Sequence, residues 1–351
     1  MGILQITSHR PQAGKTSLAA VALLTLARLG KPAGYYKPFC VQPGGDSDLA
    51  FIQEAILSPQ GGPAAPSPSI LEPSANLSEP QLQQLSEAVT ALQAAHPRVV
   101  LEGPDLETSG EQASALAVQI ASQLDSRVIV ILRYSKDHDS KDHDSDGLAG
   151  ALVSRTSEAF GGRLAGVIIN CVTKHRLAEV RQRMETELAP GNIPLLGVIP
   201  ESRIMRAPTV QQIADTLGGR WIQEPASSDQ PVERFLIGGN IMDSGPEYYG
   251  RYENQAVITR SQRPDIQLAS LVAGTKCLVL TEGGEPTEYI KAEAMERGVP
   301  VMVVESKTLE TVDALAPLLD TTPAHNLAKV QVFAKQLAEY LDLEQLAALT
   351  E

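Results

Sequence analysis

The feature that most constrains this chain is a short loop near its start, set between an apolar strand and an apolar helix. Residues 2–7 have the pattern of a buried strand, and the stretch from Thr16 to Leu29 is apolar enough for a buried helix. Between them, Gly14, Lys15 and Thr16 end the pattern of a phosphate-binding loop. Such a loop directs backbone N–H groups at phosphate oxygens, places a lysine at the β and γ phosphates, and offers a hydroxyl to Mg²⁺. The loop therefore predicts binding of a nucleoside triphosphate, ATP with Mg²⁺.

Two residues depart from the usual signature of this loop. His9 stands where the signature has its first glycine. Arg10 lies five residues before Lys15, at a position where one branch of these ATPases carries a second lysine that reaches the phosphates of a dimer partner. The Arg10 guanidinium could bind the partner's phosphates as that lysine does. An exposed loop arginine without this role is an equally good interpretation.

Strands and helices alternate after the loop. Four further runs are apolar on both faces, as in the strands of a parallel sheet, and they span 99–101, 128–132, 164–170 and 195–199. This order predicts an α/β fold, namely a parallel-sheet P-loop NTPase domain covered by helices on both faces. A formal net charge of −13 argues against nucleic acid or an anionic membrane as the main partner. With no leader and no bilayer-length apolar run, we expect a cytoplasmic protein.

The 351 residues suit two domains. The segment 223–233 has the composition of a linker, which gives a nucleotide-binding domain over 1–222, a smaller α/β domain over 234–325 and a C-terminal helix over 326–351. Residues 58–80 read as a mobile loop or lid. The pentapeptide at 136–140 is repeated at once, and its histidines, His138 and His143, are interpreted as part of a solvated loop rather than a metal site.

Several motifs together resemble dethiobiotin synthetase and its relatives: the loop, Tyr36-Lys37-Pro38 and Glu102-Gly103. In particular they resemble the dethiobiotin-synthetase-like N-terminal region of long phosphate acetyltransferases. The smaller domain is similar to the DRTGG domain that follows there, through Ile258–Gln267 and Thr281–Gly284, although Thr259-Arg-Ser-Gln262 replaces the DRTGG letters. The acetyltransferase domain of those enzymes has no counterpart in this sequence, so acetyl transfer to phosphate is not implied.

The resemblance implies roles for individual residues. Thr16 and Glu102 would hold Mg²⁺, with Asp46 or Asp48 as a further acidic contributor, because Mg²⁺ prefers hard oxygen ligands. Lys15 and Lys37 would be the catalytic cations, with Lys37 directed at the γ phosphate or at an anionic substrate. The residues expected to bind the nucleotide are Arg10, Gln12, Ala13, Gly14, Lys15, Thr16, Ser17 and Asn170, the last of them reading the adenine.

Two functions that use the nucleotide are compatible with these residues, and a third possibility is a scaffold whose phosphate-binding loop has degenerated, as His9 in place of glycine would indicate. The first is a nucleotide-dependent regulator or sensor with a ligand-binding DRTGG-like domain, acting as a homodimer or larger assembly on a small-molecule or protein partner. The alternative is an ATP-dependent ligase or phosphotransferase of the dethiobiotin-synthetase type, in which a substrate carboxylate attacks the γ phosphate. Arg260 and Arg263, with the glycine pairs 238–239 and 283–284, indicate at most an anion or nucleotide pocket in the smaller domain.

Overall fold

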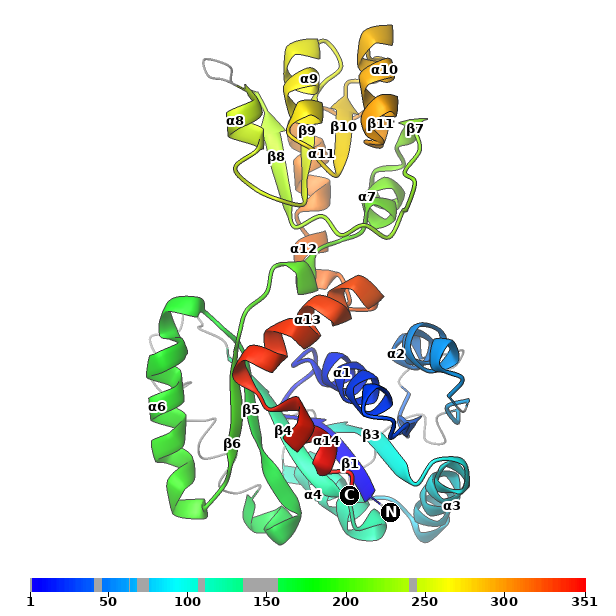
Figure 1. Cartoon of the computed structure of the whole chain (residues 1–351), viewed down its shortest axis with the longest axis vertical. Helices are drawn as coiled ribbons and strands as arrows, with labels where there is room; N and C mark the ends of the chain where they lie inside the picture. Colours follow the sequence, from blue (N-terminus) through cyan, green and yellow to red (C-terminus); the bar gives the residue numbers. More distant parts are fainter. Residues whose placement is uncertain are drawn as a thin grey trace. The chain divides into compact units, whose positions relative to one another are not determined.

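The computed structural model describes residues 2–40, 46–62, 64–67, 76–106, 111–134, 157–239 and 245–351. The repeated pentapeptide, with His138 and His143, and residues 63 and 68–75 of the expected lid lie outside these ranges. The chain forms two compact units, Met1–Ser202 with His325–Glu351 and Arg203–Ala324 (Figure 1). No helix among the described residues combines the length and the apolar character needed to cross a membrane.

The first unit contains the predicted parallel sheet. Over the described residues it has six strands in the order β2-β3-β1-β4-β5-β6, every neighbouring pair parallel. The strands are β1 (Gly2–Ser8), β2 (Gly34–Tyr36), β3 (Arg98–Asp105), β4 (Arg127–Arg133), β5 (Leu164–Val172) and β6 (Leu195–Pro200). Because β1 lies between β3 and β4, the carboxyl ends of these strands surround the loop that follows β1, where open parallel sheets bind ligands.

Helices cover both faces of this sheet (Figure 1). One face is buried by α3, α4 and α6, whose aliphatic residues interdigitate with those of the strands. On the other face α1 packs with α13 and α14. The helical segments are α1 (Lys15–Arg28), α2 (Ser47–Phe51), the π-helix η1 (Ile52–Leu57), α3 (Glu79–Ala95), α4 (Glu111–Leu124), α6 (Leu177–Leu188), α13 (Leu327–Tyr340), α14 (Leu343–Ala348) and the 3₁₀ turns η2 (Ser58–Gln60), η3 (Gly161–Arg163), η4 (Lys174–Arg176) and η5 (Ala189–Gly191).

The expected C-terminal helix is two helices in the structure. The first ends at Tyr340, and Asp342 caps the start of the second, since its carboxylate accepts hydrogen bonds from the N–H groups of Glu344 and Gln345 at 2.9 and 3.1 Å.

The second unit is a smaller α/β sheet in the order β7-β11-β10-β9-β8 over its described residues. Four strands are parallel and β7 runs antiparallel to β11. Helices α7 and α11 cover one face, and α8, α9 and α10 cover the other. The elements are η6 (Ile204–Arg206), α7 (Val210–Leu217), β7 (Arg220–Gln223), β8 (Arg234–Gly238), α8 (Gly245–Tyr249), β9 (Gln255–Arg260), α9 (Pro264–Val272), β10 (Cys277–Thr281), α10 (Glu288–Arg297), β11 (Val301–Val303), α11 (Thr308–Leu315) and α12 (Leu318–Thr321).

The boundary between the units differs from the sequence expectation. Residues 203–222, assigned to the nucleotide-binding domain, belong to the second unit. The reason is tertiary: Val210 and Ile213 of α7 pack under the second sheet, and β7 pairs with β11. The segment 223–233, expected to link the domains, therefore connects β7 to β8 inside the second unit.

Candidate functional site

The loop between β1 and α1 has the backbone of a phosphate cradle. Gly14, directly before α1, has φ of +107°, and a Cβ there would lie 2.7 Å from the Asn170 Nδ2 atom. Only glycine adopts this conformation without strain and also permits the close approach of Asn170. No side chain of the described residues caps the start of α1. Its first N–H groups and the positive end of the helix are therefore available to an anion.

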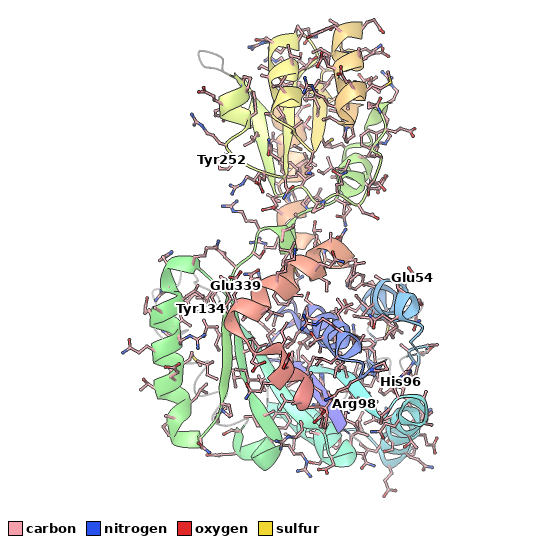
Figure 2. The ribbon with its side chains drawn as sticks, viewed as in Figure 1. Glu54, His96, Arg98, Tyr134, Tyr252 and Glu339 are labelled. Atoms are coloured by element: carbon pink, nitrogen blue, oxygen red, sulfur yellow. The ribbon has the colours of Figure 1, made fainter. Side chains whose placement is uncertain are left out.

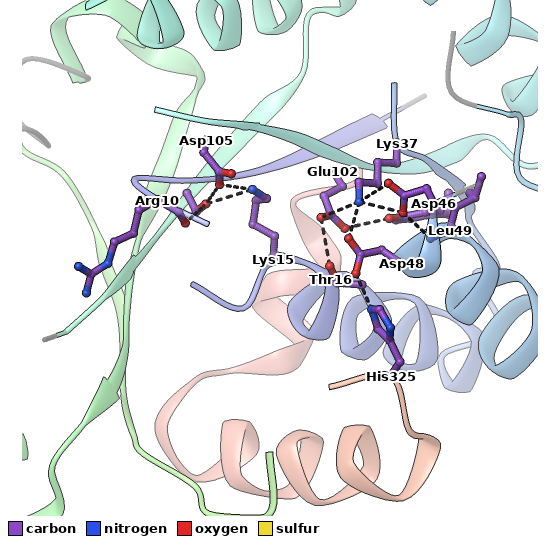
Figure 3. Close-up of polar contacts among 12 residues, drawn as sticks. Arg10, Lys15, Thr16, Lys37, Asp46, Asp48, Leu49, Glu102, Asp105 and His325 are labelled. Carbon is purple, nitrogen blue, oxygen red and sulfur yellow. Dashed lines mark hydrogen bonds and ion pairs between the residues drawn. The ribbon is translucent and has the colours of Figure 1, made fainter. Parts of the chain in front are cut away.

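Lys15 is held by two residues at the ends of neighbouring strands. Its Nζ forms an ion pair with the Asp105 carboxylate and lies 3.2 Å from the Ser8 Oγ, which also donates to Asp105 (Figure 3). Ser8 and Asp105 are register partners in β1 and β3. Sequence analysis missed Asp105, although its place at the end of the strand that carries Glu102 was a usable signal. A triphosphate that engages Lys15 must replace Asp105.

Glu102 receives two hydrogen bonds at the carboxyl end of β3. The Thr16 hydroxyl donates to its Oε1 at 3.1 Å, and the Tyr35 hydroxyl donates to its Oε2 at 2.8 Å. The side chain is 3% exposed, and this burial raises the pKa of the Glu102 carboxyl, an effect that Lys37 counteracts only in part. Burial and the neighbouring Glu102 charge likewise raise the pKa of Tyr35.

Lys37 lies among three carboxylates. Its Nζ is 2.9 Å from Asp46 Oδ1, contacts Asp48 Oδ2, and is 4.0 Å from Glu102 Oε1 (Figure 3). Although burial acts to lower the pKa of Lys37, the charges of Glu102 and Asp48 outweigh it and raise that pKa above its ordinary value. For Asp48, burial is outweighed by hydrogen bonds from His325 and Lys37, which hold its pKa below the ordinary range. The predicted acidic residues and Lys37 are thus brought together.

His325 is a member of this cluster that sequence analysis assigned to the other domain. Its Nε2 bonds to Asp48 Oδ1, and its ring stacks on Phe51 with 5.4 Å between centroids. The structure places His325 in the first unit, at the point where the chain returns from the second. Nothing in the local sequence marks this contact, because Asp48 and His325 are 277 positions apart.

Two further predicted residues, Asn170 and Arg10, form hydrogen bonds at and beside the loop. The Asn170 amide donates to the Ala13 carbonyl at 2.9 Å, and its oxygen accepts from the Cys171 N–H at 2.9 Å. These bonds hold Asn170 against the loop, and its expected recognition of the adenine base remains a prediction. Arg10 donates to the Arg133 carbonyl at 3.3 Å.

His9 connects the loop to the end of β4. Its N–H donates to the Ile131 carbonyl at 3.4 Å, and its Nδ1 accepts from the Arg133 N–H at 3.3 Å. Burial, aided by the Arg10 charge, lowers the pKa of His9 to about 4. The neutral ring can therefore accept this bond at neutral pH.

The donors around Thr16 fit a magnesium ion that completes its coordination with phosphate and water. No three His, Cys, Asp or Glu side chains in the described part of the chain are arranged to hold a metal by themselves. The Thr16 hydroxyl and the Glu102 carboxylate are adjacent hard oxygens, the kind of sparse protein set that Mg²⁺ uses with nucleotides. Three carboxylates against one lysine also leave negative charge for a cation to neutralise.

Arg260 and Arg263, the two arginines singled out in the second unit, each pair with a carboxylate. Arg260 lies 3.2 Å from Glu282, and Arg263 binds Asp265 at 3.0 Å. These contacts weaken the case for an anion pocket at the carboxyl ends of β9 and β10.

Comparison with known proteins agrees with the division of the chain into two units. Residues 3–209 match the family model described as an AAA domain, and residues 212–318 match the DRTGG domain. The phosphate acetyltransferase of Pseudomonas putida is 25% identical over 350 residues, covering 94% of this chain and 49% of its own length. That of Nitrosomonas europaea is 23% identical over 362 residues, covering 97% and 50%. The chain thus spans about half the length of these relatives.

Among solved structures, the septum site-determining protein MinD of Pyrococcus horikoshii, complexed with Mg-ADP, is similar at a TM-score of 0.33 and 16% identity. The match covers 58% of this chain and 83% of that one. Similarity at this level carries no weight for function.

Proposed function

The chain belongs to the AAA-domain family, and from this we propose that it is an ATP- and magnesium-binding regulator whose DRTGG domain responds to the nucleotide. Its two domains together are homologous to the N-terminal region of phosphate acetyltransferases. The observation that carries the proposal is the arrangement of Lys15 and Thr16 at the uncapped start of α1, beside Glu102. The proposed active form is a homodimer or larger assembly.

Each residue has a task in this proposal. The Lys15 ammonium would leave Asp105 and neutralise the β and γ phosphates, while backbone N–H groups of the loop hold the remaining oxygens. Thr16 and Glu102 would hold Mg²⁺, with Asp46 or Asp48 in support. When bound, the ion supplies positive charge between the phosphates.

The alternative is an ATP-dependent ligase or phosphotransferase, and Lys37 is the residue it depends on. In that function the Lys37 ammonium would bind a substrate anion. Three carboxylates surround it in the structure, so a substrate anion would have to replace at least one of them, as a triphosphate would have to replace Asp105 at Lys15.

The test is ADP release and ATP binding by purified protein, with and without a low-molecular-weight cell filtrate. At an ATP concentration a hundredfold above Kd, ligand adds roughly 2.7 kcal/mol, or about 5–11 °C in a thermal scan. We expect this shift in the wild type and in Lys174→Ala, an exposed control, and expect Lys15→Ala to lose it. A shift retained by Lys15→Ala would refute nucleotide binding at this loop, and filtrate-stimulated ADP release that Lys15→Ala abolishes would favour the ligase.

A further inference from the structure

His325 lies where the chain re-enters the first unit. The second unit ends at Ala324, so His325 is the next residue along the chain. Asn326 then caps α13 by accepting a hydrogen bond from the Lys329 N–H at 3.2 Å. Helix α13 packs on α1, the helix that begins with Lys15 and Thr16. His325 therefore lies in the short stretch of chain that leads from the second unit into α13, the helix that packs on α1.

An unbroken series of polar contacts joins His325 to the proposed magnesium ligands. It runs from His325 to Asp48, from Asp48 to Lys37, from Lys37 to Glu102 and from Glu102 to Thr16 (Figure 3). Asp48 is the shared member, because its Oδ1 bonds to His325 while its Oδ2 bonds to Lys37. Both oxygens of this carboxylate are thus engaged by protein side chains.

We propose that the hydrogen bond between His325 and Asp48 forms in the protein without nucleotide and breaks when magnesium and nucleotide bind. We call this contact the latch. The inference rests on the proposed function. A divalent cation beside Thr16 and Glu102 attracts the nearby carboxylates and repels the Lys37 ammonium. When Asp48 turns toward the ion, directly or through water, its bond to His325 breaks. The state of the nucleotide site is then transmitted to the segment that connects to the second unit.

The helix that carries Asp48 is suited to such movement. Helix α2 is short and continues directly into the π-helix η1, a wide-turn geometry found frequently at functional sites. Phe51 lies at this junction and stacks on the His325 ring. A shift of the Asp48 segment therefore acts on His325 through two contacts, one polar and one aromatic.

The latch predicts reciprocal coupling, because a contact that nucleotide must break also weakens nucleotide binding. We expect His325→Ala to bind Mg-ADP roughly three- to tenfold more tightly than the wild type. His325→Gln keeps a donor for Asp48 and should fall between the two. His175→Ala, a change at an exposed histidine of the same unit, should match the wild type.

Hydrogen exchange over residues 322–330 gives the second readout. In the wild type, Mg-ADP should increase exchange there, whereas in His325→Ala exchange should be high from the start and unchanged by Mg-ADP. If Mg-ADP binds His325→Ala and His175→Ala equally and leaves exchange in the wild type unchanged, the latch is refuted and the nucleotide site stands. If Mg-ADP binds none of these proteins, the proposed function fails and the latch with it.

Discussion

The sharing of one ammonium among three carboxylates makes Lys37→Met the most informative substitution. Methionine keeps the length of the side chain and removes its charge, leaving Asp46, Asp48 and Glu102 without their common partner. The side chains of Lys37, Asp46 and Glu102 are 15%, 10% and 3% exposed, so water compensates little. Asp48, at 28%, is better hydrated.

The expected cost follows from this burial. Breaking a buried ion pair by removing one partner destabilises a protein by about 3–5 kcal/mol, and the partial hydration of Asp48 places this site near about 3 kcal/mol. For a unit of this size that corresponds to roughly 6–12 °C in the midpoint of thermal unfolding. Because the chain has two units, calorimetry should show the first unit's transition moving and the second unit's staying in place.

The loss should also depend on pH and on magnesium. Burial already raises the pKa of the Glu102 carboxyl, and without Lys37 this pKa rises further above its unfolded value, so the folded variant binds more protons than its unfolded chain. The difference in unfolding free energy between Lys37→Met and the wild type should therefore shrink as the pH falls from about 8 to about 5. Added Mg²⁺ should restore part of the lost stability by supplying positive charge.

The control is Lys291→Met on α10, where a lysine that is 30% exposed pairs with Glu285 and Glu288. Water screens such surface pairs and they contribute little to stability, so the control should unfold close to the wild type. If Lys37→Met unfolds within about 0.5 kcal/mol of the wild type at neutral pH, the cluster does not depend on its lysine and the reasoning is wrong.

Two further predictions concern the loop itself. Asp105→Asn removes the charge that holds Lys15 and should tighten ATP binding several-fold by calorimetric titration, whereas weaker binding would mean that Asp105 assists the nucleotide. Arg10→Ala should abolish a dimer that forms only with Mg-ATP, as measured by light scattering. A wild type that stays monomeric with Mg-ATP would exclude the role of Arg10 in a partner's site.

The loop and the first sheet could be predicted because their signals are local. An apolar strand, a glycine and a lysine at the start of an apolar helix are adjacent in the sequence. Lys37, Asp46, Asp48 and Glu102 were singled out only through the family resemblance, and the structure brings their side chains together. Parallel strands also bring their carboxyl ends to one edge regardless of the loops between them.

The domain boundary and His325 could not be predicted in the same way. The proline- and serine-rich composition of 223–233 marks a loop, but composition does not tell which sheet the preceding α7 and β7 will join. The contact of His325 with Asp48 joins positions 277 residues apart, with the whole sequence of the second unit between them. Asp105 is a different case, since its register with Ser8 follows once β1 and β3 are known to be neighbours.

The return of the chain to the first unit has a consequence for the order in which the protein folds. Helix α1 is buried along most of its length, and α13 and α14, which pack on it, are made only after all of residues 203–324. During synthesis the second unit can fold first, while α1 leaves apolar surface uncovered. The phosphate loop and α1 are thus translated well before the helices that complete their cover. A fragment ending near residue 222 would expose this surface permanently and should aggregate.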